Sequence, residues 1–186
     1  MKRLLICLSV MLCLVACKQT KTDADATGEN TQQQANISDG SEYEKNGRYC
    51  IYREPVTIDS EDGRYHVYIT MTPDFKQPSV KNESFNRTYC DNKASLCITT
   101  ATDTIIVKDF DKTSFSEYVD ANIVSRAIFN RLTCRGFSKD AIKLEAEISV
   151  PHSDEECYVT IMVGADGSLT MKRYESEDVP EEIAGA

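Results

Sequence analysis

Two residues in the second half of the chain, a cysteine and a histidine, are of the kinds used in nucleophilic catalysis. Cys157 follows His152 by five residues, with three carboxylates between them, and an imidazole beside a thiol can activate that thiol as a nucleophile. A solvated turn histidine is the more common arrangement for such a sequence. Cys157 would also lie at the start of a strand, and not at a helix N-terminus that lowers the pKa of a thiol. A thiol-dependent enzyme is therefore the least favoured of three functions.

The chain starts with the features of an export signal. Lys2 and Arg3 precede a short apolar stretch that ends at small Ala16, which is typical of a cleaved signal peptide and not of a transmembrane helix. Residues 14–17 resemble the lipobox of bacterial lipoproteins, and this resemblance implies that Cys17 becomes the lipidated N-terminus. Several acyl chains form a stable membrane anchor. We expect a signal peptide over residues 1–16, with a plain secretory signal as the alternative.

Five cysteines remain after Cys17 and the two cysteines of the signal: Cys50, Cys90, Cys97, Cys134 and Cys157. An odd number in an exported protein leaves at least one thiol free or paired between molecules. Cys90 and Cys97 flank six residues that fit a hairpin loop, so a local disulfide between them is one prediction. Buried, reduced cysteines that act as small apolar residues are the alternative.

Other motifs for catalysis or metal binding are weak. The sequence contains no Gly-x-Ser-x-Gly elbow, P-loop or dinucleotide-binding glycine pattern, and neither histidine has a second ligand at metal spacing. Acidic clusters at residues 59–62 and 154–156 are better explained as solvated turns than as calcium sites. We predict no catalytic residue, no metal and no cofactor. Residues 103–105 resemble a three-residue O-glycosylation signal, which makes Thr104 a candidate for modification.

The composition argues against one class of partner. The formal net charge is −9, and the mature chain is more acidic still because Lys2 and Arg3 leave with the signal. An acidic protein is repelled by phosphate backbones and by anionic lipid surfaces. We therefore expect no nucleic-acid partner, and we attribute membrane attachment to the lipid on Cys17.

The mature chain divides into three parts by composition. Residues 17–47 contain the lipidated cysteine and a polar stretch that cannot offset the entropy of ordering, so they are predicted to form a disordered tether. Residues 48–175 are long enough for a single globular domain. Residues 176–186 form an acidic, flexible tail.

One segment of the domain shows helical spacing. Ser114 and Glu117 have the spacing of a capping box. Apolar residues recur at helical intervals from Phe115 to Cys134, and Gly136 suits the end of a helix. This pattern predicts the principal helix of the domain.

Strand patterns occupy most of the remaining domain. After the predicted helix, residues 142–150 alternate strictly between apolar and polar, and residues 157–163 and 168–174 fit a hairpin. We predict an α+β fold, with a curved antiparallel sheet of about seven or eight strands and one principal α-helix packed on it. A small lipocalin-like β-barrel with one helix is the alternative.

The order of these pieces resembles a known family. The residues that carry the resemblance are Tyr89-Cys90-Asp91-Asn92, residues 108–115, and residues 150–156 before the hairpin. Over roughly residues 55–175 the chain is similar to uncharacterised lipoproteins of Bacteroidetes-type bacteria, in domain-of-unknown-function family 4738. The family has no known activity, so the resemblance implies no catalytic residue. Cys90 stands where the family pattern has an aromatic residue.

These observations together favour a non-enzymatic envelope lipoprotein, a binding or accessory module for another envelope protein or a small molecule. A carrier of an apolar small molecule is the alternative, and it would need a large apolar pocket. Lys18, where an aspartate would signal retention at the inner membrane, favours the outer membrane. No compact acidic run follows Cys17, which slightly favours the periplasmic face, although Asp23 and Asp25 leave surface display open.

Overall fold

Strands dominate the computed structural model, which describes residues 38–174. Of these residues, 56% lie in strands and 6% in helices. The strands form three four-stranded sheets, called here sheets A, B and C. The predicted α+β class with one principal helix is therefore wrong. The barrel alternative is wrong too, because no sheet in residues 38–174 closes on itself. The predicted signal peptide, Cys17 and the tail at 176–186 lie outside the described residues.

Sheet B forms one layer of the core and is antiparallel throughout. Its strand order is β3-β4-β7-β8, with β3 at Val56–Asp59, β4 at His66–Asp74, β7 at Asp91–Thr99 and β8 at Thr104–Asp111. Alternate residues of β4 point inward, so that Val67, Ile69 and Met71 are buried.

Sheet C forms the facing layer and confirms the strand predictions for the end of the domain. Its order is β12-β11-β10-β9, with β9 at Ile128–Phe137, β10 at Ala141–Ser149, β11 at Glu156–Gly164 and β12 at Leu169–Arg173. The alternating stretch predicted over residues 142–150 coincides with β10 up to Ser149, and its residues Ile142, Leu144, Ala146 and Ile148 are fully buried. The predicted hairpin is β11 and β12.

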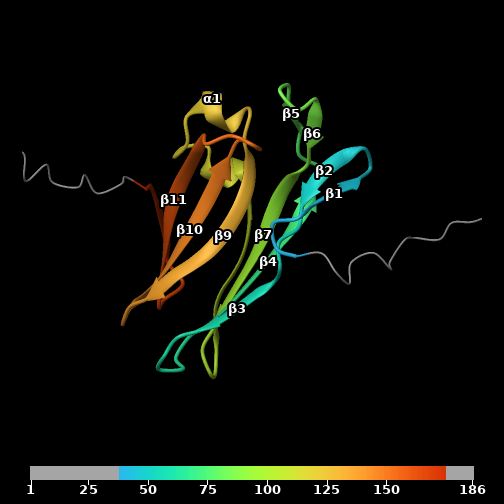
Figure 1. Cartoon of the computed structure of the whole chain (residues 1–186). Coiled ribbons are helices and arrows are strands. Elements are labelled where there is room, and N and C mark those ends of the chain that lie inside the picture. Colours follow the sequence, from blue (N-terminus) through green and yellow to red (C-terminus); the bar gives the residue numbers. More distant parts are fainter. Residues whose placement is uncertain (1–37, 175–186) are drawn as a thin grey trace, which may run out of the picture. The chain divides into compact units, whose positions relative to one another are not determined.

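The core lies between sheets B and C, which stack as two layers in Figure 1. Apolar residues from β4, β7 and β8 meet those of β9, β10 and β11 in one continuous cluster. Phe115 lies between Phe110 and Phe129, with ring centroids 5.8 and 5.0 Å away, distances typical of favourable aromatic pairs. Burial of this apolar surface is the main force that holds the two layers together.

Sheet A is smaller and has a separate small core. Its order is β1-β2-β6-β5, with β1 at Glu42–Lys45, β2 at Arg48–Ile51, β5 at Val80–Asn82 and β6 at Arg87–Tyr89. Val80 and Tyr89 of this sheet are buried together with Ile128. Strand β1 lies inside the stretch predicted to be a tether. Asn46 and Gly47 join β1 to β2 with φ of 55° and 70°, the conformation of a type I′ hairpin turn.

The predicted helix is replaced by two single turns and a strand. A 3₁₀ turn, η2, covers Lys112–Phe115 and a short helix, α1, covers Ala121–Val124, after which β9 begins. A capping box is present, but it is formed by Asp111 and Ser114 and not by the predicted pair of Ser114 and Glu117. The Asp111 side chain accepts from the Ser114 N–H, and the Ser114 hydroxyl accepts from the Asp111 N–H. The helical spacing beyond residue 128 comes from two irregularities in the pairing of β9 with β10, since each bulge shifts the inward-facing residues by one position.

The predicted loop at residues 91–96 is instead the first part of β7. Asp91 and Asn92 are turn-forming types, yet both are buried. The Asp91 Oδ1 accepts from the Phe129 N–H at 2.8 Å, and Asp91 Oδ2 forms an ion pair with Lys112 Nζ at 2.8 Å. Asn92 donates to the Phe129 carbonyl at 2.9 Å, and Lys112 donates to the Ala127 carbonyl at 2.7 Å. These partners on β9 and η2 satisfy the polar groups, so a strand can begin here.

Candidate functional site

A groove between β3 and β9 combines an apolar floor with charged groups at one end. Its volume is about 450 Å³, and its floor is formed by Ile69 and Met71 of β4 and Leu132 of β9. Val56 pairs with inward-facing Ile69, so its side chain also points to the inner face of sheet B. Val56 is nevertheless 41% exposed, because sheet C leaves the β3 end of that inner face partly uncovered.

The polar end of the groove is organised by Arg53, whose side chain is only 10% exposed. Its Nε donates to the Asn130 carbonyl at 3.0 Å, and a terminal nitrogen donates to Asn130 Oδ1 at 2.5 Å. Asp39 forms ion pairs with Arg53 at 3.7 Å and with Arg131 at 2.7 Å. Burial and then the Arg131 charge lower the pKa of Arg53. Asn130 in turn donates to Glu147.

Both long walls of the groove are edge strands. Among the strands of residues 38–174, β3 pairs only with β4, and β9 pairs only with β10. Side chains bind the outer edge of β9 at three residues. Asp91 and Asn92 bind the Phe129 backbone, Arg53 binds the Asn130 carbonyl, and the sulfur of Met71 accepts from the Leu132 N–H at 3.2 Å. An edge strand beside an apolar floor is the arrangement to which an extended peptide adds as a further strand.

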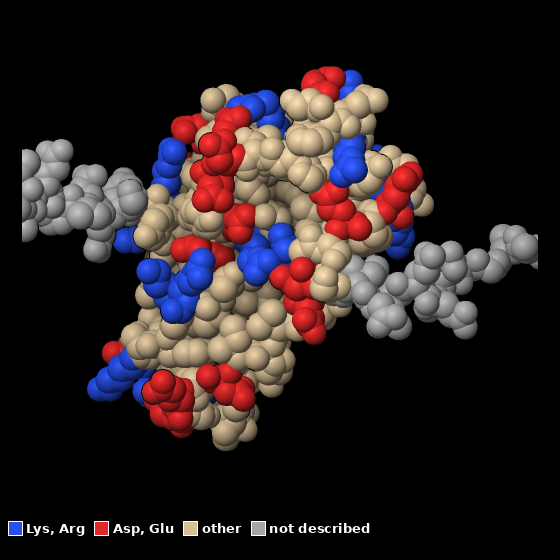
Figure 2. All heavy atoms as spheres, in the orientation of Figure 1, with Lys and Arg blue, Asp and Glu red and all other residues tan. Residues whose placement is uncertain are grey.

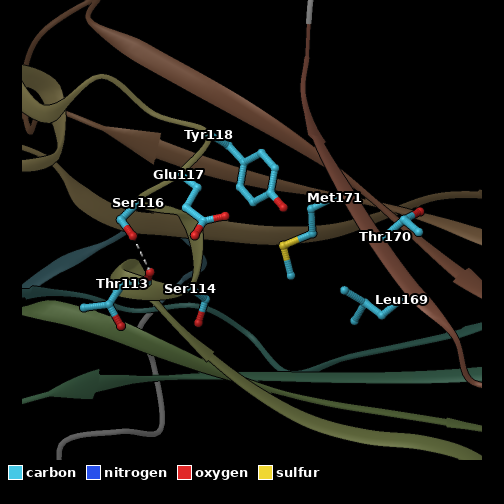
Figure 3. A pocket seen from close by; sticks show the side chains of 8 residues that line it. All are labelled: Thr113, Ser114, Ser116, Glu117, Tyr118, Leu169, Thr170 and Met171. Carbon is cyan, nitrogen blue, oxygen red and sulfur yellow. Dashed lines mark hydrogen bonds between the residues drawn. The ribbon is translucent and has the colours of Figure 1, made fainter.

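A second hollow, of about 570 Å³, lies between the segment after η2 and strand β12. Figure 3 shows Glu117 and Tyr118 on one side of it, with Leu169 and Met171 on the other. The Ser116 hydroxyl donates to the Thr113 carbonyl at 2.9 Å, so this hydroxyl is already bound within its own turn. The β3–β9 groove is the better candidate, since it has both an apolar floor and a nearly buried guanidinium.

A comparison with protein families places this domain. The family model of a domain of unknown function, DUF4738, matches residues 30–171. The chain belongs to this family. The match covers all three sheets up to Met171 in β12, and the predicted membership of domain-of-unknown-function family 4738 is therefore confirmed. No curated protein matches the chain.

The DUF4738 domain does not bring the predicted nucleophile and base together. His152, in the turn between β10 and β11, has φ of 57° and contacts Glu42 Oε1 through Nε2 at 2.8 Å. Its ring packs on Phe85, with centroids 4.7 Å apart. The Cys157 thiol instead lies in the core, 4.0 Å from the Tyr118 carbonyl, and burial raises its pKa. A raised pKa leaves less thiolate at neutral pH, which opposes a role as nucleophile.

The other predicted positions of the domain are placed as follows. Cys90 and Cys97 are both free. Cys90 directly precedes β7 and Cys97 lies within it, which places them about 23 Å apart at the rise of an extended chain. The hairpin that would join them is absent. Thr104 is exposed at the start of β8, so it is accessible to modification. In the acidic cluster at 59–62, Asp62 is bound by Ser60 and Arg64 within its own turn.

The sequence pointed to none of the residues that make the polar end of the groove. Arg131 is the one residue for which the sequence held a signal, because a charged side chain between the apolar residues of β9 indicates a position that is not in the core. Arg53 gave none, since its partners Asn130 and Asp39 are distant in sequence. Within residues 38–174, no helix is both long and apolar enough to cross a membrane, and no three histidine, cysteine or acidic side chains cluster as metal ligands would.

Proposed function

We propose that this chain is a lipoprotein of the bacterial cell envelope, anchored by lipid on Cys17, whose domain is a non-enzymatic binding module. The outer membrane is the favoured location, with the domain on its periplasmic face. The main support for a binding role is the β3–β9 groove, which has an apolar floor, two strand edges and Arg53 at one end. We further propose that the groove holds an extended segment of another envelope protein.

Two features favour an extended peptide over an apolar small molecule. Side chains from both layers pack in one continuous cluster between sheets B and C, where a carrier would instead enclose its ligand. The groove itself is bordered by two edge strands, and an edge strand such as β3 can pair with another backbone. Figure 2 shows acidic and basic side chains intermixed on the surface around it, so the peptide gains little from net charge alone.

Site-specific photo-crosslinking in intact cells tests this proposal. A photoreactive residue replaces Val56, which faces the groove, or in a matched variant Val107, which is 69% exposed on the opposite edge strand β8. We expect one protein, identified by mass spectrometry, to be captured through position 56 and not through position 107. Capture of the same proteins from both positions would refute the groove as the binding site, and capture of only lipid at position 56 would favour the carrier.

The anchor is tested in the same cells. The variant Cys17→Ser removes the thiol that would carry the lipid, and we expect the protein to move from the membrane fraction to the soluble fraction. Membrane association that survives this substitution would refute lipid anchoring at Cys17. Because the groove is unchanged in this variant, failure of the anchor and failure of the binding site are distinguished.

A further inference from the structure

Two cysteines distant in the sequence lie side by side in sheet A. Strand β2 pairs with β6 in parallel, with Tyr49 opposite Tyr89. Cys50 and Cys90 each follow one of these tyrosines, and the Cys90 N–H donates to the Tyr49 carbonyl at 2.8 Å. Neighbouring strands lie about 5 Å apart, which is within the range of Cα separations that a disulfide spans.

The two thiols also share one enclosed environment. Both residues are 0% exposed, and each thiol lies close enough to the other to affect its pKa. Tyr43 lies opposite Cys50 on strand β1, so its side chain is on the same face of sheet A. Burial, followed by the proximity of Cys50, raises the pKa of Cys90 to about 12. Two buried thiols at adjacent positions of paired strands are placed as disulfide formation requires.

We propose that Cys50 and Cys90 form a structural disulfide that joins β2 to β6. A disulfide oxidant supplies the chemistry: the Cys50 thiolate attacks one of its sulfurs and releases the first oxidant thiol. The Cys90 thiolate then attacks the mixed disulfide at the Cys50 sulfur and releases the second. Two protein thiols become one disulfide, and the oxidant disulfide becomes two thiols.

The position of this bond gives it a structural role. Sheet A has a small apolar core, with Val80, Tyr89 and Ile128 as its buried members, so it has less apolar burial than the layers formed by sheets B and C. Cys90 is the residue at which the chain passes from β6 to β7, and hence from sheet A into sheet B. A bond from Cys50 to this point secures the first hairpin of the domain to the body of the protein.

The bond forms during folding, because thiols with raised pKa inside a closed sheet react slowly. The full chain is therefore unfolded in urea with its thiols reduced, then refolded in a mixture of reduced and oxidised glutathione, and free thiols are alkylated. Trypsin places each of the five cysteines of the described domain in a different peptide. We expect one linked pair, residues 49–53 joined to residues 88–93, with Cys97, Cys134 and Cys157 alkylated.

Thermal unfolding gives a second, independent readout. In the refolded wild-type chain, a reductant should lower the midpoint temperature of unfolding by about 10 °C. The reductant opens the disulfide, and the length of the loop between Cys50 and Cys90 sets how much stability is lost. The reductant should have no effect in Cys90→Ala, whereas the matched variant Cys97→Ala should respond like the wild type. Because each variant is compared with itself, any loss of packing from the substitution cancels. Full alkylation of Cys50 and Cys90, glutathione attached to either, or a link to another cysteine would overturn the proposal.

Discussion

The buried ion pair between Asp91 and Lys112 gives the sharpest test of how this fold is held together. Asp91 is fully buried and the Lys112 side chain is 11% exposed, with Nζ 2.8 Å from the carboxylate. The pair connects β7 of sheet B to the turn η2, and through the N–H of Phe129 it reaches β9 of sheet C. We predict that Lys112→Met, which keeps the length of the side chain but removes its charge, strongly destabilises the domain.

The magnitude follows from what the substitution leaves behind. The Asp91 carboxylate keeps its hydrogen bond from Phe129 but loses its counter-charge, and the Ala127 carbonyl loses the donor at 2.7 Å. Removing one partner of a buried ion pair costs about 3–5 kcal/mol, since an uncompensated charge stays in the interior. With a denaturant slope of about 2 kcal/mol per M, the urea midpoint should fall by about 2 M.

Urea unfolding followed by circular dichroism and by tyrosine fluorescence measures this, since the chain has nine tyrosines and no tryptophan. Lys81→Met is the matched control: Lys81 forms an ion pair with Glu83 at 2.9 Å, but both side chains are more than half exposed. Exposed pairs of this kind contribute about 0–1 kcal/mol. Equal losses for Lys112→Met and Lys81→Met would refute the reasoning.

A double variant separates the ion pair from simple loss of packing. Asp91→Asn combined with Lys112→Met removes both charges, while the amide oxygen can still accept from Phe129. The double variant should be more stable than the sum of the two single losses predicts, by at least about 2 kcal/mol, because no lone charge remains buried. Strict additivity would show that the two charges do not interact.

Two further predictions concern turns. Gly47 and Gly167 have similar φ, 70° and 78°, but a Cβ at Gly47 meets no atom within 4 Å, whereas at Gly167 it would lie 2.7 Å from the Ile105 carbonyl oxygen. Gly47→Ala should cost about 1 kcal/mol from backbone strain, and Gly167→Ala at least about 1 kcal/mol more from the clash; equal losses in urea unfolding would contradict that contact. Hydrogen bonds, led by that from the Ser60 hydroxyl, lower the pKa of Asp62 to about 2. The stability this adds is therefore complete above the unfolded pKa and lost as pH falls from about 4 to 2. An NMR titration should show the pKa of Asp62 rising in Ser60→Ala, and an unchanged value would contradict this cause.

The strands that the sequence predicted well are those with uninterrupted alternation. In β10, Ile142, Leu144, Ala146 and Ile148 are all fully buried and the residues between them are polar. This strand has a neighbour on each side and one face on the core, so its burial repeats every two residues and the pattern is readable without a structure. The hairpin of β11 and β12 was predictable for a different reason, since a glycine-containing turn separates an almost continuous apolar stretch from a second short strand pattern.

The prediction of a helix failed because β9 does not keep this period. Phe129, Leu132, Cys134 and Phe137 pair with the four buried apolar residues of β10, so the inward positions are separated by three, two and three residues. Asn130 and Arg135 are the extra residues at the two bulges. Inward-facing apolar residues that recur three positions apart have the same spacing as the apolar face of a helix. Only the register against β10 distinguishes the two structures, and register is a property of the pair of strands.

The loop prediction was wrong and the groove was missed for the same reason. The residues concerned are bound by residues that are distant in the sequence. Asp91 and Asn92 favour a turn until Phe129 and Lys112 supply the groups that satisfy them in a strand. Arg53 likewise gains its role from Asn130, 77 residues later. In both cases a polar side chain from outside sheet C binds the backbone of β9, whose outer edge is not paired with another strand. The irregular strand β9, whose bulges gave its sequence the spacing of a helix, therefore also supplies the backbone groups of Phe129 and Asn130. These groups bind Asp91 of the buried ion pair and Arg53 of the groove.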